Sequence, residues 1–166
     1  MSIIIRDARI EDIPHIQDIT AEAFGKYARE LGLPQKVAAL NETKEDIQHD
    51  LDKKSVLICL LDGKEVGSIR FEVLPDGIAY ISRFGVKLMA QGHGIGRALM
   101  AEVEKRCRKM GVSSIRLHTS AKMSSLVCFY YSQGYYIHST STDKGYIRAL
   151  LVRELNDSVE SLSKAL

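Results

Sequence analysis

The sequence predicts one domain of mixed α/β (α+β) fold, built on a mixed sheet with helices on both faces. Short apolar runs typical of strands alternate along the chain with stretches of helical periodicity, and turn residues separate them. The 166 residues, 45% apolar and 27% charged, suffice for one compact core and are too few for two. We expect this domain over residues 1–155, followed by a C-terminal tail over 156–166.

The N-terminal half predicts a strand, two helices and three further strands. The first strand covers residues 3–6, and a helix begins after Asp12, whose side chain we expect to cap it. Gly32-Leu33-Pro34 ends that helix. The elements that follow are a polar helical stretch over 35–53 with Thr43 as a cap, a hairpin of strands over 56–61 and 66–73 that turns at Asp62-Gly63, and a strand over 78–86.

The C-terminal half predicts two helices and three strands. In the first helix, Leu99, Val103, Cys107 and Met110 share one apolar face, and Gly111 ends it. The later elements are a strand over 115–119, a helix over 124–133, and two paired strands over 135–140 and 146–152 that turn at Asp143-Lys144-Gly145.

Composition excludes several classes of partner. A net charge of +2 gives no reason to expect nucleic acid or a membrane surface as a partner, and the longest apolar run, 56–61, is too short to cross a bilayer. Cys59, Cys107 and Cys128 have no metal-ligand spacing, and we expect no metal ion. Cys59 and Cys107 fall on apolar periodic positions, which suggests buried thiols. The N-terminus shows no signal peptide, so we expect a cytoplasmic protein.

Gly92, Gly94 and Gly96 lie at alternate positions between a predicted strand and a predicted helix. Glycine allows close approach to the backbone, and the first N–H groups of a helix lack partners within the chain. This combination suits a phosphate or pyrophosphate, although an ordinary tight turn would use glycine too. A P-loop would need Lys and Ser/Thr at Arg97 and Ala98, and a dinucleotide fingerprint would need glycine at 97.

Two motifs resemble those of the GNAT superfamily, the acyl-CoA-dependent N-acetyltransferases. Gln91-x-x-Gly94-x-Gly96 resembles its central signature, Arg/Gln-x-x-Gly-x-Gly/Ala, and 129–135 resembles its downstream pattern, Leu/Phe-Tyr-x-x-x-Gly-Phe/Tyr. The opening of the chain, 4–12, also resembles the start of the family. The resemblance implies a GNAT-like fold with a mostly antiparallel sheet, acetyl-CoA as co-substrate, and direct acetyl transfer to a primary amine.

The resemblance also implies how the cofactor is held. The loop N–H groups would bind the pyrophosphate, and a bulge near Phe84-Gly85-Val86 would offer backbone groups to the pantetheine and the thioester. Glycine at 85 suits such a bulge. We expect His93 to be non-catalytic. The cofactor-binding residues implied are Phe84, Gly85, Val86, Gln91, Gly92, His93, Gly94, Ile95, Gly96 and Arg97.

Tyr130 lies at the tyrosine position that many members of the family use as the general acid toward the CoA sulfur. A phenol is protonated at neutral pH and can donate to a departing thiolate. The glutamate that often serves as the base is replaced by Tyr80, so the base is left open among Glu72, His118 and water. Met123 replaces an asparagine that is frequent in the family.

The acceptor is not encoded in a recognisable motif. Acidic residues over 42–52 favour a cationic acceptor, such as a polyamine, an aminoglycoside or a lysine side chain. The resemblance also implies a possible homodimer, because many members of the family form one. The missing glutamate motivates an alternative, a GNAT-like module that binds or senses acyl-CoA without turnover. A third interpretation is a regulatory domain that binds another phosphorylated ligand at the glycine loop.

Overall fold

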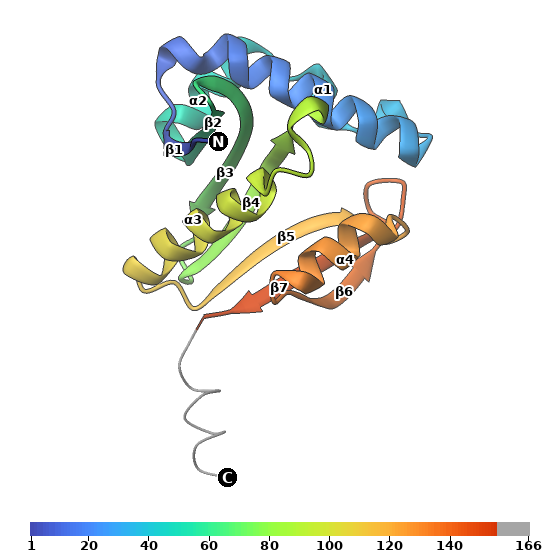
Figure 1. Cartoon of the computed structure of the whole chain (residues 1–166). Coiled ribbons are helices and arrows are strands. Elements are labelled where there is room, and N and C mark those ends of the chain that lie inside the picture. The colour runs from blue at the N-terminus through green and yellow to red at the C-terminus, as the bar shows by residue number, and fades with distance from the viewer. Residues whose placement is uncertain (156–166) are drawn as a thin grey trace.

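Residues 1–155 of the computed structural model form a seven-stranded sheet in the order β1-β2-β3-β4-β5-β7-β6 (Figure 1). The strands are β1 (Ile3–Asp7), β2 (Ser55–Leu61), β3 (Lys64–Val73), β4 (Ile78–Val86), β5 (Ser114–Ser120), β6 (Tyr136–Ser141) and β7 (Arg148–Glu154). The pair β4·β5 is parallel and the other pairs are antiparallel, which confirms the predicted mixed, mostly antiparallel sheet. The tail expected over 156–166 lies outside the described residues.

The helices cover both faces of the sheet, as predicted (Figure 1). They are α1 (Ile13–Leu31), α2 (Lys44–Lys53), α3 (Ile95–Lys109) and α4 (Ser124–Ser132). Alternate residues of β2 divide between the two layers, because successive side chains of a strand point to opposite faces. Ile58 packs with Ile16 of α1 and Ile47 of α2, whereas Cys59 belongs to the cluster that contains Cys107 of α3.

Both predicted structural thiols are buried. Burial raises the pKa of Cys59 and of Cys107 to about 11, so the two side chains stay neutral and pack as small apolar groups. Among the helices of residues 1–155, none combines the length and the apolar character needed to span a bilayer.

The predicted helix over 35–53 begins only at Lys44. Two 3-10 turns, Pro34–Lys36 and Ala38–Asn41, occupy the first part of the stretch. The start of α2 is fixed by Thr43, as predicted: its Oγ1 accepts from the Asp46 N–H at 3.1 Å, and the Asp46 carboxylate accepts from the Thr43 N–H at 2.9 Å. Local capping therefore sets the boundary within a polar stretch that has little periodicity.

Two smaller predictions are wrong. Asp12 does not cap α1 with its side chain, because its carboxylate binds the Arg6 guanidinium at 2.7 and 3.0 Å and the Arg9 N–H at 2.8 Å. Met110 does not share the buried face of α3. The helix ends one residue before it, and its side chain is 52% exposed, whereas Val103 and Cys107 are fully buried.

Candidate active site

The strands β4 and β5 pair only at their beginnings, over 78–80 and 114–116. Beyond these residues they separate, and a cleft of about 990 Å³ opens between them. Its walls come from α1, β4, the glycine loop, the start of α3, the end of β5, α4 and the turn before β7. The parallel pair in the centre of the sheet therefore creates the space in which the predicted site residues meet.

The cleft gathers nearly all of the predicted site residues. The predicted cofactor residues that line it are Phe84, Gly85, Val86, Gln91, Gly92, Gly94, Ile95, Gly96 and Arg97. Tyr130 and His118 line it as well, together with Tyr80. His93 and Glu72 are not among its lining residues. Glu72 of β3 pairs with Tyr80 but is absent from the lining, so of Glu72 and His118 only His118 lines the cleft.

The glycine loop presents unpaired backbone donors at the start of α3. The N–H groups from Gly92 to Arg97 donate to no acceptor within residues 1–155, and no side chain caps the helix. Gly92 and Gly94 have positive φ angles of 84° and 77°, and a Cβ at either would meet open space. Such a concave set of N–H groups at the positive end of a helix dipole is suited to an anion.

Gly96 keeps the cleft open between two aromatic rings. A Cβ at this position would lie 3.3 Å from the Phe84 ring and 3.5 Å from the Phe129 ring. Gly85 has another role. A Cβ there would lie 2.8 Å from the Cβ of Ala23, so glycine is required by the close packing of α1 on β4 and not by the bulge that we expected it to serve.

The expected bulge in β4 lies one to two residues earlier than Gly85. Ser82 pairs with Arg70 and Gly85 pairs with Ser68, so Arg83 and Phe84 together lie opposite a single residue of β3. Arg83 has a φ of 49°, a left-handed conformation that is rare for a long side chain. The bulge interrupts the ladder and turns the backbone of β4 toward the cleft.

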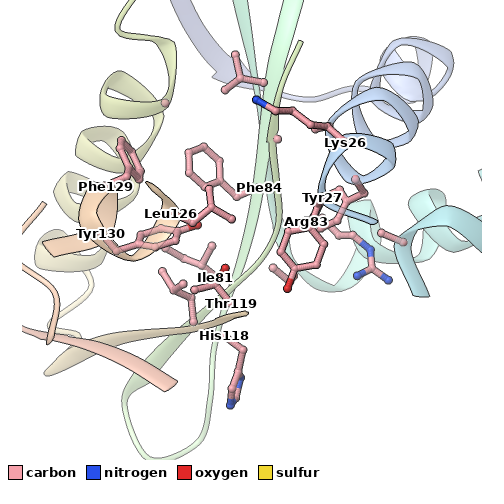
Figure 2. Close-up of a pocket in the computed structure, with 18 of the residues that line it drawn as sticks. Lys26, Tyr27, Ile81, Arg83, Phe84, His118, Thr119, Leu126, Phe129 and Tyr130 are labelled. Carbon is pink, nitrogen blue, oxygen red and sulfur yellow. The ribbon is translucent and has the colours of Figure 1, made fainter. Parts of the chain in front are cut away.

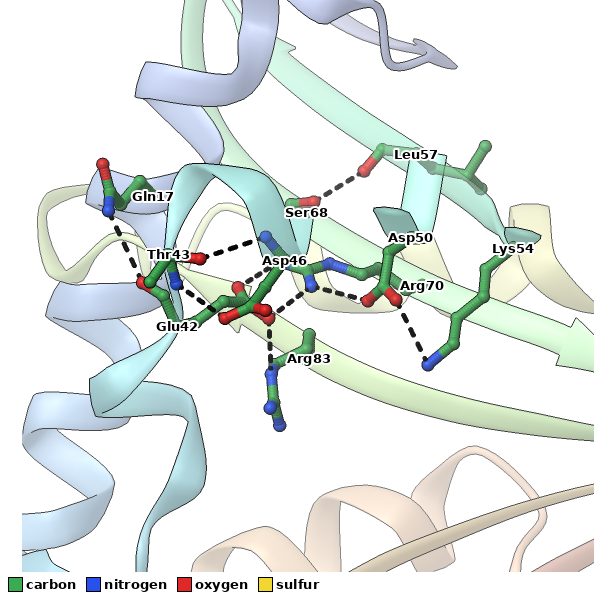
Figure 3. Close-up of polar contacts among 10 residues, drawn as sticks. All are labelled: Gln17, Glu42, Thr43, Asp46, Asp50, Lys54, Leu57, Ser68, Arg70 and Arg83. Atoms are coloured by element: carbon green, nitrogen blue, oxygen red, sulfur yellow. Dashed lines mark hydrogen bonds and ion pairs between the residues drawn. The ribbon is translucent and has the colours of Figure 1, made fainter. Parts of the chain in front are cut away.

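A network of buried ion pairs contacts Arg83 of this bulge (Figure 3). Arg70 is fully buried and donates to both carboxylate oxygens of Glu42 at 2.7 Å and to Asp50 at 2.9 Å. Glu42 also accepts from Arg83 Nε at 3.0 Å. The network therefore ties the strained Arg83 to the body of the domain. It also occupies two of the acidic residues from which we expected a cationic acceptor.

Tyr130 lies in an aromatic cluster on the α4 wall of the cleft (Figure 2). Its ring centroid is 5.3 Å from that of Phe129, 6.4 Å from that of Phe84 and 6.1 Å from that of Tyr135. Burial raises the pKa of the Tyr130 phenol, because the charged phenolate would lose its hydration. The hydroxyl makes no hydrogen bond within residues 1–155. It therefore remains protonated, with its proton free for a ligand.

Tyr80 and His118 form a pair across the strand junction. The Tyr80 hydroxyl lies 2.5 Å from Nδ1 of His118. Burial is the main cause that lowers the pKa of His118, and Arg148 lowers it further. Burial also raises the pKa of Tyr80. At neutral pH the imidazole is therefore neutral and the phenol keeps its proton. In the tautomer that carries its proton on Nε2, His118 accepts at Nδ1 from the Tyr80 hydroxyl.

The other side of the cleft contains residues that the sequence did not single out. The Tyr27 hydroxyl of α1 accepts from the Ser120 N–H at 3.0 Å and lies 3.2 Å from the Tyr146 hydroxyl. Figure 2 shows Tyr27 and Lys26 across the cleft from Phe129 and Tyr130. Arg83 and Arg148 also line the cleft. In the sequence, Tyr27 belonged to the apolar period of a helix and to the segment 27–55 that we expected on the acceptor side, but no motif gave its hydroxyl a role.

The comparisons with known proteins agree with this geometry. Residues 22–135 match the Acetyltransferase (GNAT) family. The sequence has no significant match among curated proteins.

Three solved structures illustrate the likeness of the fold. The PaiA N-acetyltransferase of Thermoplasma acidophilum, in complex with coenzyme A, is 21% identical with a TM-score of 0.84, over 93% of this chain and 100% of that one. The ribosomal-protein-S18-alanine N-acetyltransferase of Escherichia coli is 17% identical with a TM-score of 0.76, over 93% and 95%. Ard1 of Thermoplasma volcanium is 21% identical with a TM-score of 0.74, over 94% and 99%. The chain therefore belongs to the acetyltransferase (GNAT) family.

Proposed function

We propose that this protein transfers an acetyl group from acetyl-CoA to a primary amine within the cleft between β4 and β5. The observation that carries the proposal is the run of unpaired N–H groups from Gly92 to Arg97, whose residues other than His93 line the same cleft as Tyr130 with its protonated, unbonded hydroxyl. One wall thus offers an anion site and the other a proton donor. The likeness to a solved acetyltransferase with bound coenzyme A supports the choice of donor.

The residues of the cleft fit acetyl-CoA. The loop N–H groups and Arg97 would hold the pyrophosphate, where Gly92 and Gly94 leave open space in place of side chains. The bulged backbone of β4 from Arg83 to Val86 would bind the pantetheine, because a bulge leaves backbone groups unpaired. His93 lies outside the lining of the cleft, which agrees with a non-catalytic role.

Acetyl-CoA supplies a thioester whose carbonyl carbon is open to attack by an amine. As the nitrogen–carbon bond forms and the carbon–sulfur bond breaks, Tyr130 donates its proton to the departing sulfur, and solvent entering the open cleft then returns a proton to the phenolate. Its buried hydroxyl stays protonated well beyond neutral pH, so the donor form is fully populated under ordinary conditions. The walls of the cleft hold the amine and the thioester in contact, which supplies a large part of the rate.

We infer that the Tyr80–His118 pair is the general base. A phenol alone is a poor base at neutral pH. Here, however, the Tyr80 oxygen can take the amine proton while its own proton passes to Nδ1 of His118, which is neutral and 2.5 Å away. The two side chains together would then replace the glutamate that stands at the position of Tyr80 in many relatives. Bulk water would afterwards remove the proton from His118.

Free thiol released from acetyl-CoA tests the proposal. Purified protein is mixed with acetyl-CoA and a panel of primary amines, and the new thiol and the acetylated amine are both quantified. We expect one thiol for each acetylated amine with the native protein, and strongly reduced release with Tyr130→Phe. Tight binding of acetyl-CoA without release for any amine would favour the sensing module instead. The sensing function rests on the missing glutamate, and the Tyr80–His118 pair argues against it.

A further inference from the structure

The cleft is basic at the end formed by the turn between β6 and β7. Lys144 and Arg148 line it from this turn and the start of β7, and Lys36 lines it from the segment between α1 and α2. Among the lining residues that the structure describes, Glu30 is the one carboxylate, and it lies 3.9 Å from the amine of Lys26. Lys26 also donates to Gln91 of the glycine loop. The one carboxylate of the lining is therefore already paired with a lysine of α1.

Two segments distant in sequence bring the three basic side chains together. A Cβ on Gly145 would lie 3.1 Å from Nζ of Lys36, so the lysine side chain lies directly against the turn. The hydrogen-bond distance of 3.2 Å between Tyr27 and Tyr146 joins the same two parts of the molecule. Contacts between distant segments therefore form the basic end of the cleft. It lies close enough to the Tyr80–His118 pair for Arg148 to affect the pKa of both side chains.

These charges are poorly neutralised. Within residues 1–155, Lys36 and Lys144 have no carboxylate within ion-pair distance. Arg148 lies 3.7 Å from Asp143, whose side chain is 63% exposed, and such a pair is weak in water. Nε of Arg148 is buried without a partner in the described part of the chain. Arg148 and Lys144 also lower the pKa of His118, against the opposing effect of Asp143, so their field reaches the base.

The acidic residues that could balance this charge serve other purposes. Glu42 and Asp50 neutralise the buried Arg70, and Asp46 caps α2. The expectation of a cationic acceptor rested on these side chains together with Glu45 and Asp52, and none of the five lines the cleft. A second ammonium group on the acceptor would instead lie against Lys36, Lys144 and Arg148, where like charges repel.

Resting on the acetyl transfer proposed above, we propose that the acceptor is a small amine that also carries an anionic group, a carboxylate or a phosphate. Lys36, Lys144 and Arg148 receive the anionic group while the amine lies at Tyr80. The arginine fork suits either anion, because its N–H groups can bind two oxygens at once. The same positive field disfavours an ammonium ion at the base, so the acceptor amine enters in its neutral, nucleophilic form.

Matched amines separate this acceptor class from the others. The first set has four carbons: 4-aminobutyrate, butylamine and 1,4-diaminobutane. The second set compares O-phosphoethanolamine with ethanolamine and so distinguishes a phosphate from a carboxylate. We expect kcat/KM for at least one anionic amine to exceed that of its neutral counterpart by about tenfold or more, the size of effect expected for a charge-assisted hydrogen bond, with the diamine slowest.

Variants of the basic end test the assigned residues. Lys144→Gln and Arg148→Met should each raise KM for the preferred anionic amine by about tenfold, leave the Kd of acetyl-CoA unchanged, and change KM for the neutral amine far less. Lys144 is exposed in a turn, so its variant should fold even if Arg148→Met does not. Lys64→Gln, which makes the same charge change at the exposed start of β3, outside the cleft, is the matched control.

Faster transfer to butylamine or to the diamine than to every anionic amine overturns the inference and leaves acetyl transfer intact. Acetyl-CoA binding without transfer to any anionic amine also overturns it. If Lys144→Gln and Arg148→Met both have the same KM for the anionic amine as the native protein, these two residues do not recognise the acceptor. Failure of the native protein to bind acetyl-CoA is a different result, because it overturns the proposed function itself.

Discussion

The Tyr80 hydroxyl lies 2.5 Å from Nδ1 of His118 and joins β4 to β5 where the two parallel strands begin to separate. The resemblance to the family implies a basic glutamate at the position of Tyr80. Neither side chain alone is an effective base at neutral pH. The raised pKa of Tyr80 keeps its phenol protonated, and the lowered pKa of His118 makes its imidazole a weaker proton acceptor. Together they form a hydrogen-bonded path along which a proton can leave the acceptor amine.

If the two side chains act as one unit, their effects on the rate are not additive. Tyr80→Phe and His118→Gln should each lower kcat by about 10² or more, the usual size of a general-base contribution, and the double variant should be no slower than the worse single variant. Steady-state kinetics of the three variants, with the Kd of acetyl-CoA as a control, measure this. A double variant whose loss is the product of the single losses would show that the residues act independently.

The pH dependence follows from the direction of the His118 shift. Burial lowers the pKa of His118 below its ordinary value of about 6.5, so the proton-accepting form is present at neutral pH and is lost as the pH falls. We therefore expect kcat/KM to fall on the acid side with a midpoint below 6.5, and His118→Gln to lack this limb. A midpoint well above 6.5 that disappears in the variant would contradict the assigned environment of the imidazole.

Tyr130→Phe removes only the hydroxyl from the aromatic cluster. The ring still packs against Phe84 and Phe129, so acetyl-CoA should bind with little change while kcat falls by about 10². Tyr131→Phe is the matched control, because Tyr131 is the next residue on α4 and its side chain is 50% exposed. Calorimetry gives the binding and initial rates give kcat. Identical rates for the two variants would remove Tyr130 from its role as acid.

Glu42 is the centre of the network behind the bulge, so its loss should be costly. Glu42→Ala leaves the fully buried Arg70 with a single carboxylate partner, Asp50, and should destabilise the fold by about 3–5 kcal/mol. Asp7→Ala breaks an ion pair with Arg106 in which Asp7 is 72% exposed, and should cost less than about 1 kcal/mol. Urea denaturation measures both, and equal costs would show that the buried network contributes no more than a surface pair.

Local signals in the sequence predicted most of the fold. The Asp62-Gly63 turn has φ angles of 49° and 81° at its two residues, the left-handed conformations for which this dipeptide is chosen in tight hairpins. The Thr43 cap and the glycine loop could also be predicted, because each depends on residues close together in the chain. Asp12 failed as a cap because its partner, Arg6, lies on a different element.

The charge of the acceptor side could not be predicted, because it depends on contacts between distant residues. Tyr27 meets Tyr146, 119 positions away, and Arg70 meets Glu42 and Asp50, 28 and 20 positions away. In the sequence, Glu42 and Asp50 looked like part of an acidic, substrate-facing patch. Only the fold reveals that a buried arginine already occupies them and that the side chains left facing the cleft are basic.

Binding of acetyl-CoA to the glycine loop is the central claim, and a calorimetric titration tests it most directly. Gly94→Trp would fill the open space beside the unpaired N–H groups. Gly77→Trp is matched to it, since both glycines have φ angles near 80° and space for a side chain, but Gly77 lies outside the cleft. We predict that the native protein and Gly77→Trp bind acetyl-CoA and that Gly94→Trp does not. Equal affinity of the two variants, or no binding to the native protein, would contradict the account.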